Sequence, residues 1–153
     1  MRQFMAFICV FVSVGFLNGA PGLAQGQVEI VGDSFVISET KNTATFTGNV
    51  VIKQSGLTVW ADKVVILYGA GGASDIETLK AIGHVRIETE TQMVTGDTGE
   101  YDPQARVMRV VGNVVTTNES GTVKGPELLV NFATNTTEFV QQNGNRVTGV
   151  FNQ

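Results

Sequence analysis

Three aspartates are the most regular of the side chains in this sequence that could do chemistry. Asp33, Asp62 and Asp97 each follow a small residue, and they are separated by 29 and 35 residues. Repeated carboxylates could serve acid-base catalysis or bind calcium. An aspartate beside a turn also accepts hydrogen bonds from nearby backbone N–H groups. We expect this second role, because each aspartate marks a corner between two stretches of strand-like sequence.

The remaining reactive side chains are too few to build a known catalytic or metal site. His84 is the single histidine, and it shares the outward face of an alternating segment with Arg86, so we expect it to be solvated. An imidazole without cysteine or histidine partners makes a poor zinc site. Cys9 is the single cysteine, and the sequence has neither a Gly-x-Ser-x-Gly elbow nor a glycine-rich phosphate loop before a helix. We therefore predict no catalytic residues, no metal site and no cofactor, and a protein that is not an enzyme.

The charge of the chain argues against nucleic acid as a partner. Ten basic side chains stand against 14 acidic ones, for a net charge of −4, and the Lys and Arg residues are scattered. Binding to phosphate backbones requires a concentrated basic face. The sequence offers none.

The N-terminus has the features of a secretory signal. Arg2 precedes an uncharged apolar run from Phe4 to Leu17, and small residues follow up to Ala24. The run is shorter than the ~20 apolar residues of a spanning helix, although an uncleaved anchor is the alternative. We predict that residues 1–24 are a cleaved signal peptide and that residues 25–153 form a single domain.

The domain reads as β-strands. Val, Ile and Thr make up roughly a third of the residues after Ala24, a composition that favours pleated strands. From Ala44 to Lys53 the even positions are apolar or Gly and the odd positions are mostly polar, which is the two-residue period of a half-buried strand. Ser74 and Glu77 form one capping-box pattern, which predicts at most a single helical turn.

Two short signatures recur along the chain at fixed spacing. The first is a small residue followed in three of four cases by Asp, at intervals of 29, 35 and 29; its small residues are Gly32, Ala61, Gly96 and Gly125. The second is Gly-Asn-Val or Gly-His-Val, at intervals of 35 and 29; it begins at Gly48, Gly83 and Gly112. The apolar column changes parity across each small-Asp pair, which predicts a bulge or corner there.

Such a repeat implies stacked units that share one interior. A unit consisting of strand, corner, strand and turn cannot bury its apolar face without a neighbour. We therefore predict an all-β, open, twisted roll of stacked antiparallel strand repeats, without a substantial helix and with two exposed strand ends. The loop from Gly69 to Ser74 accounts for the longer spacing of 35 and is expected to lie outside the stack.

These residues resemble a known family. The stretch Thr45-Phe-Thr-Gly-Asn-Val-Val-Ile-Lys-Gln-Ser-Gly56, followed by Leu57-Thr-Val-Trp-Ala-Asp-Lys-Val-Val-Ile66, is similar to the hallmark of OstA-like domains. The resemblance to the LptA/OstA family extends from Val28 to Val150. It departs from the family pattern at Gly125-Pro126-Glu127, which replaces the small-Asp pair, and at Gln141, where a fourth Gly-Asn-Val would fall.

The resemblance implies a β-jellyroll that binds the acyl chains of lipopolysaccharide in an apolar groove and carries them across the periplasm for outer-membrane assembly. Together with the signal, it implies a periplasmic protein of a Gram-negative bacterium. The groove would be lined by the inward columns: Ile37, Phe46, Val50, Ile52, Val59, Val64, Ile66, Val85, Ile87, Tyr101, Val114, Leu128 and Val130. From the residues alone, an apolar column of a β-roll is more often sealed core than a ligand groove, and only the resemblance favours the groove.

The two ends of the roll are the expected sites of assembly, because unpaired edge strands accept further strands. The resemblance implies head-to-tail contacts between copies, and contacts with homologous jellyroll domains of an inner-membrane anchor and an outer-membrane barrel. The edge residues would be Val28, Ile30, Val147 and Val150, and proline at Val147 should block assembly. The alternative function is a structural β-repeat module that joins proteins through its edges without lipid. Trp60 points away from the inner column, either toward a partner or over one edge of the sheet.

Overall fold

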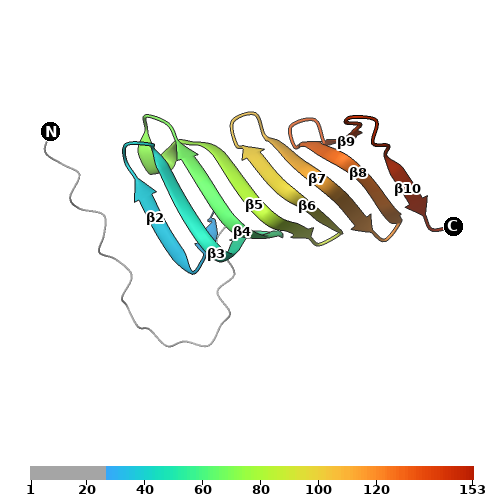
Figure 1. Ribbon diagram of the computed structural model, residues 1–153, viewed down its shortest axis with the longest axis horizontal. Coiled ribbons are helices and arrows are strands. Elements are labelled where there is room, and N and C mark those ends of the chain that lie inside the picture. Colours follow the sequence, from blue (N-terminus) through green and yellow to red (C-terminus); the bar gives the residue numbers. More distant parts are fainter. Residues whose placement is uncertain (1–26) are drawn as a thin grey trace, which may run out of the picture.

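The computed structural model describes residues 27–153 and is a single open β-sheet. The expected signal, residues 1–24, lies outside the described residues. Ten strands follow one another along the long axis of the molecule, from β2 at one end to β10 at the other (Figure 1). Their bounds are β1 Glu29–Val31, β2 Ser34–Ser38, β3 Thr43–Gln54, β4 Leu57–Tyr68, β5 Ile76–Thr89, β6 Gln92–Asp102, β7 Val107–Asn118, β8 Gly121–Asn131, β9 Thr136–Val140 and β10 Thr148–Phe151.

All strand pairs are antiparallel, in the order β1-β3-β4-β5-β6-β7-β8-β10. Two short strands share each end: β2 also pairs with β3, and β9 also pairs with β8. The sheet does not close, which confirms the predicted open all-β roll. The helical turn expected from Ser74 is a 3-10 turn, η1, at Gly72–Ser74, and β5 has already begun by Ile76. No helix in residues 27–153 is long and apolar enough to cross a membrane.

The repeats correspond to bends in the long strands. Register shifts separate Thr47 from Val50, Ile82 from Val85 and Val111 from Val114, so that two residues oppose one on the next strand. Both residues of each pair have positive φ: Gly48 and Asn49, Gly83 and His84, Gly112 and Asn113. The prediction placed the bulge at the small-Asp pair. The extra residue is instead on the Gly-Asn or Gly-His strand, where Gly and Asn tolerate left-handed backbone.

The bends turn the two halves of each long strand toward a shared core. One inward row, which we call the central rung, crosses the sheet in register: Phe35, Phe46, Val64, Ala81, Gly99, Val110, Leu128 and Phe139. A second row, the corner rung, alternates valine with small residues: Val50, Ala61, Val85, Gly96, Val114 and Gly125. Small residues are needed at the corner because side chains crowd there. A Cβ on Gly96 would lie 2.5 Å from Val110 Cγ1.

Candidate functional site

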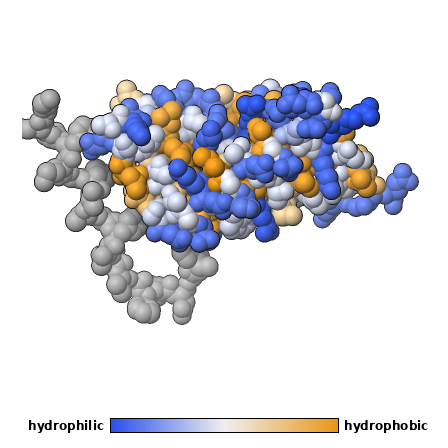
Figure 2. Space-filling view, in the orientation of Figure 1, coloured by the Kyte–Doolittle hydropathy of each residue, from blue (hydrophilic) through white to orange (hydrophobic). Residues whose placement is uncertain are grey.

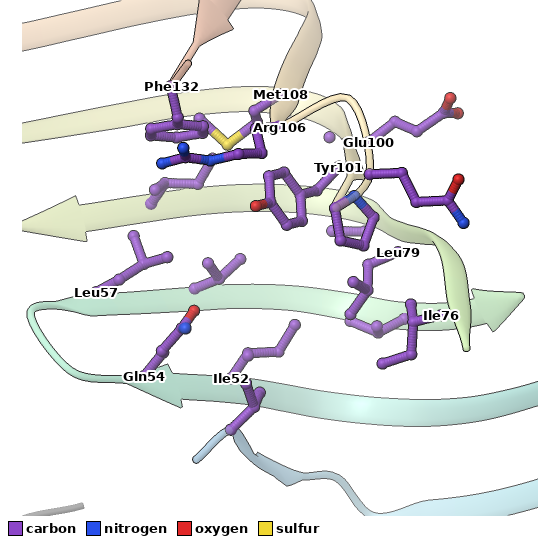
Figure 3. Close-up of a pocket in the computed structure, with 18 of the residues that line it drawn as sticks. Ile52, Gln54, Leu57, Ile76, Leu79, Glu100, Tyr101, Arg106, Met108 and Phe132 are labelled. Atoms are coloured by element: carbon purple, nitrogen blue, oxygen red, sulfur yellow. The ribbon is translucent and has the colours of Figure 1, made fainter. Parts of the chain in front are cut away.

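An apolar cavity of about 760 Å³ lies between the two halves of the bent sheet. This volume is within the range of small-molecule binding sites. The cavity is bounded by strands β3 to β7, by the β3-β4 turn and by the loops that precede β5 and β7. Figure 3 shows Ile52, Leu57, Ile76, Leu79 and Met108 pointing into it from strands β3, β4, β5 and β7.

The cavity exists because the central rung is small in its middle. Ala81 and Gly99 both line the cavity and occupy the two middle positions of that rung. Larger side chains fill the same row on both sides. Toward β2 the rings of Phe35 and Phe46 pack with centroids 4.5 Å apart, and toward β9 the buried Leu128 pairs with Phe139.

The predicted groove residues all lie on inward rows, but they have different surroundings. Six of them line the cavity: Ile52, Val59, Val64, Val85, Ile87 and Tyr101. Four of the others are sealed in the core with at most 3% exposure: Val50, Ile66, Val114 and Leu128. Phe46 and Val130 pack against that core. Ile37 is 62% exposed, because β2 is an end strand with no neighbour to cover it. Binding of lipid by these residues remains a prediction.

Several lining residues were missed by the sequence reasoning. Leu57, Leu79 and Met108 continue the inward rows, so the two-residue period could have found them. Arg106 and Phe132 lie in turns and join the site only through the fold. Phe132 contacts Tyr101 edge to face, with ring centroids 6.0 Å apart, so the turn after β8 reaches past β7 to β6.

The carboxylates near the cavity are directed away from its interior. Asp75 lines the cavity, but its carboxylate accepts a hydrogen bond from the backbone N–H of Gly71 at 3.1 Å. Glu100 also lines the cavity, and in Figure 3 its carboxylate points away from the labelled apolar side chains. The interior therefore suits an apolar occupant.

The repeated aspartates bind side chains across the sheet, which corrects the expected bonding to turn backbone. Asn49 donates to Asp33 at 3.0 Å, and Asn113 donates to Asp97 at 3.2 Å. The third pair joins Asp62 and His84 Nδ1 at 2.7 Å. Each carboxylate packs against the glycine of the neighbouring bulge, where a Cβ would collide with it. The aspartates therefore stabilise the bends.

His84 is solvent-exposed, as expected, with 91% of its side chain accessible. The hydrogen bond from His84 to the Asp62 carboxylate, together with the negative charge of that carboxylate, raises the pKa of His84 above its ordinary value of 6.5. Within residues 27–153, no three His, Cys, Asp or Glu side chains are grouped as metal ligands. Trp60 lies on the outer face, where Arg86 stacks 4.9 Å from the ring centroid.

A buried carboxylate lies in the Gly125-Pro126-Glu127 segment, where the sequence departs from the repeat. Glu127 is 5% exposed and accepts hydrogen bonds from Arg109 and Gln142. The Arg109 guanidinium lowers the pKa of Glu127 below its ordinary value of 4.5. Gln142 belongs to the segment between β9 and β10, so Glu127 ties that segment to β8.

Both ends of the sheet expose large apolar side chains. At the β1-β2 end the exposed residues are Val28, Val31, Phe35, Val36 and Ile37, and at the β10 end they are Val147, Val150 and Phe151. On the face shown in Figure 2, hydrophobic residues reach the surface mainly over the N-terminal strands. Of the predicted edge residues, Ile30 lies in β1 and Val150 lies in β10. Val28 immediately precedes β1, and Val147 immediately precedes β10.

Comparison with known proteins gives a family match, a curated relative and similar solved structures. The family model described as "LptA/(LptD N-terminal domain) LPS transport protein" matches residues 29–136. An uncharacterized protein of Rhizobium meliloti (strain 1021) is 28% identical over 102 residues, which are 63% of this chain and 55% of the relative. The chain thus matches about half the length of that relative.

A similar solved structure is that of LptH, the LptA-homologous periplasmic component of the conserved lipopolysaccharide transport device from Pseudomonas aeruginosa. The TM-score is 0.72, with coverage of 83% of this chain and 96% of LptH. At 15% sequence identity, this likeness establishes the β-jellyroll fold.

Proposed function

The chain belongs to the LptA/LptD N-terminal-domain family of lipopolysaccharide transport proteins, and from this premise we propose that its cavity binds the acyl chains of lipopolysaccharide. The observation that carries this proposal is the apolar cavity of about 760 Å³ kept open by Ala81 and Gly99. A sealed core would place large side chains at these two positions.

The energetics suit a lipid carrier. Burial of about a dozen methylenes contributes on the order of 10 kcal/mol before ordering costs, at ~0.8 kcal/mol each. A single site of that strength would retain the lipid. Transfer therefore requires a neighbouring groove of similar affinity, which a second domain of the same fold supplies.

We place this transfer in the periplasm, after export through a cleaved N-terminal signal. Homologous jellyroll domains at the inner and outer membranes would contact the two ends of residues 25–153. The exposed apolar side chains of β2 and β10 favour such contacts, since unpaired apolar strands accept further strands. The same edges support the second candidate function, a module that joins proteins without lipid. The family is one of transport components, and we propose no enzymatic role.

Filling the cavity separates the two candidate functions. A Cβ on Gly99 would meet Val85 Cγ1 at an ordinary 3.5 Å, so Gly99→Leu adds its remaining carbons to the cavity without a backbone clash. We expect this variant to lose capture of lipopolysaccharide by a photocrosslinker placed at Ile87, while its oligomer sizes by light scattering stay unchanged. Lys80→Leu, on the exposed outer face of β5, is the matched control and should retain capture. Undiminished crosslinking in a folded Gly99→Leu protein would contradict the carrier function and favour the lipid-free module.

A further inference from the structure

Arg106 occupies a backbone conformation that its side chain does not favour. Its φ is 55°, in the left-handed region, where Asn and Gly are preferred over long side chains. Asp102 Oδ1 fixes the turn by accepting hydrogen bonds from the backbone N–H groups of Gln104 and Ala105 at 2.9 Å. The Arg106 carbonyl then accepts a hydrogen bond from Phe132 N–H at 2.9 Å. Hydrogen bonds to Asp102 and from Phe132 thus stabilise the strained conformation of Arg106.

The equivalent turns of the molecule place asparagine at this position. Asn42 directly precedes β3 with φ 51°, and Asn135 directly precedes β9 with φ 54°. The Asn42 carbonyl accepts a hydrogen bond from Tyr68 N–H at 2.9 Å, as the Arg106 carbonyl does from Phe132. The fold therefore accommodates the preferred residue, and Arg106 is the exception. Strained residues of this kind occur preferentially at functional sites.

Arg106 differs from the two asparagines in its position at the cavity. It is the one Lys or Arg among the described residues that line the cavity. In Figure 3 its guanidinium lies below the Phe132 ring, on the same side of the site as Tyr101 and Met108. Within residues 27–153 it forms no ion pair with a carboxylate. An unpaired guanidinium thus stands at the edge of an apolar cavity.

We propose that Arg106 binds the anionic group next to the acyl chains of the ligand, a phosphate in the case of a phosphorylated glycolipid. This inference rests on the proposed function, because it assigns the polar end of the same ligand. A guanidinium donates two parallel N–H groups to phosphate or carboxylate oxygens. The cavity would then select anionic amphiphiles over neutral ones of equal chain length.

The test compares wild type with Arg106→Asn, using purified lipid A, enzymatically dephosphorylated lipid A and inorganic phosphate as three separate probes. Displacement of an apolar fluorophore from the cavity reports binding. We expect Arg106→Asn to bind lipid A about tenfold more weakly, a loss of ~1.4 kcal/mol, and to bind the dephosphorylated lipid as wild type does. Because asparagine suits the turn, the melting temperature should not fall. Lys41→Asn removes the same charge beside the equivalent Asn42 turn and should leave all affinities unchanged.

Each alternative result is distinguishable. Equal affinity of wild type and Arg106→Asn for lipid A would overturn the assignment of Arg106. An equal loss for both lipids would also overturn it, since it would indicate packing rather than charge recognition. Displacement of lipid A by inorganic phosphate from wild type would assign the anion to free phosphate and overturn the link to the acyl chain. If wild type binds neither lipid, the proposed function itself fails.

Discussion

The packing of the repeated aspartates against the bulge glycines can be tested at one pair, Asp97 and Gly112. Gly112 has φ +88°, and a Cβ placed on it would lie 2.7 Å from Asp97 Cγ and 2.8 Å from Asp97 Cβ. Gly56 has a similar φ of +73°, but no atom lies within 4 Å of its Cβ position. The two glycines therefore share a backbone requirement and differ in the contact.

The expected magnitudes follow from these two terms. Gly56→Ala should lower the free energy of unfolding by about 1 kcal/mol, the cost of a left-handed alanine. Gly112→Ala adds overpacking against Asp97, typically 1–3 kcal/mol, and displaces the Asp97 carboxylate from Asn113. We therefore expect a total loss of about 3 kcal/mol. Removing the aspartate as well, in Asp97→Ala/Gly112→Ala, should relieve the clash and reveal a coupling of about 2 kcal/mol.

Urea denaturation followed by circular dichroism measures these differences, provided the denaturant slope is the same in all variants. The comparison needs wild type, the two glycine variants, Asp97→Ala and the double variant. Equal losses for Gly112→Ala and Gly56→Ala would show that the aspartate does not pack against the bulge in solution. Strictly additive effects in the double variant would have the same meaning.

Three further predictions concern polar side chains. The pKa of Glu127 is lowered in the folded protein, so its contribution to stability is complete above pH 4.5 and is lost as pH falls through the folded-state pKa. Acid should therefore destabilise wild type more than Glu127→Gln. Parallel pH profiles of the melting temperatures of the two proteins would contradict this. Thr116 has a buried hydroxyl without a hydrogen-bond partner, so Thr116→Val should raise the free energy of unfolding by about 1 kcal/mol in urea denaturation, and a loss would show that the hydroxyl is satisfied. Asp62→Asn should lower the pKa of His84 toward 6.5 in an NMR titration, because it removes the main cause of the raised value; an unchanged pKa would mean that the pair does not form in solution.

The repeat made the architecture predictable from the sequence. The spacings of 29 and 35 correspond to one pair of strands, and the inward columns were identified because the two-residue period holds within each half strand. The offset of 16 residues that relates Gly32 to Gly48 also relates Asp33 to its partner Asn49. The side-chain pairing across the bends was therefore present in the spacing, although it was interpreted as local bonding.

The location of the cavity was not predictable in the same way. Ala81 and Gly99 each look unremarkable in their own strand, and a cavity forms only because register places them side by side in one row. Arg106 carries no periodic signal, since it lies in a turn. Its positive φ and its position at the edge of the cavity are visible only in the structure.

The repeated bend also determines how such a protein can change in length. One repeat, such as residues 83–111, comprises the second half of β5, all of β6 and the first half of β7, and it pairs with the repeats before and after it. Duplication of one unit would lengthen the roll by about 9–10 Å, two strand spacings, and would leave both end strands unaltered. The length of the molecule and the sequences of its two end strands can therefore evolve independently.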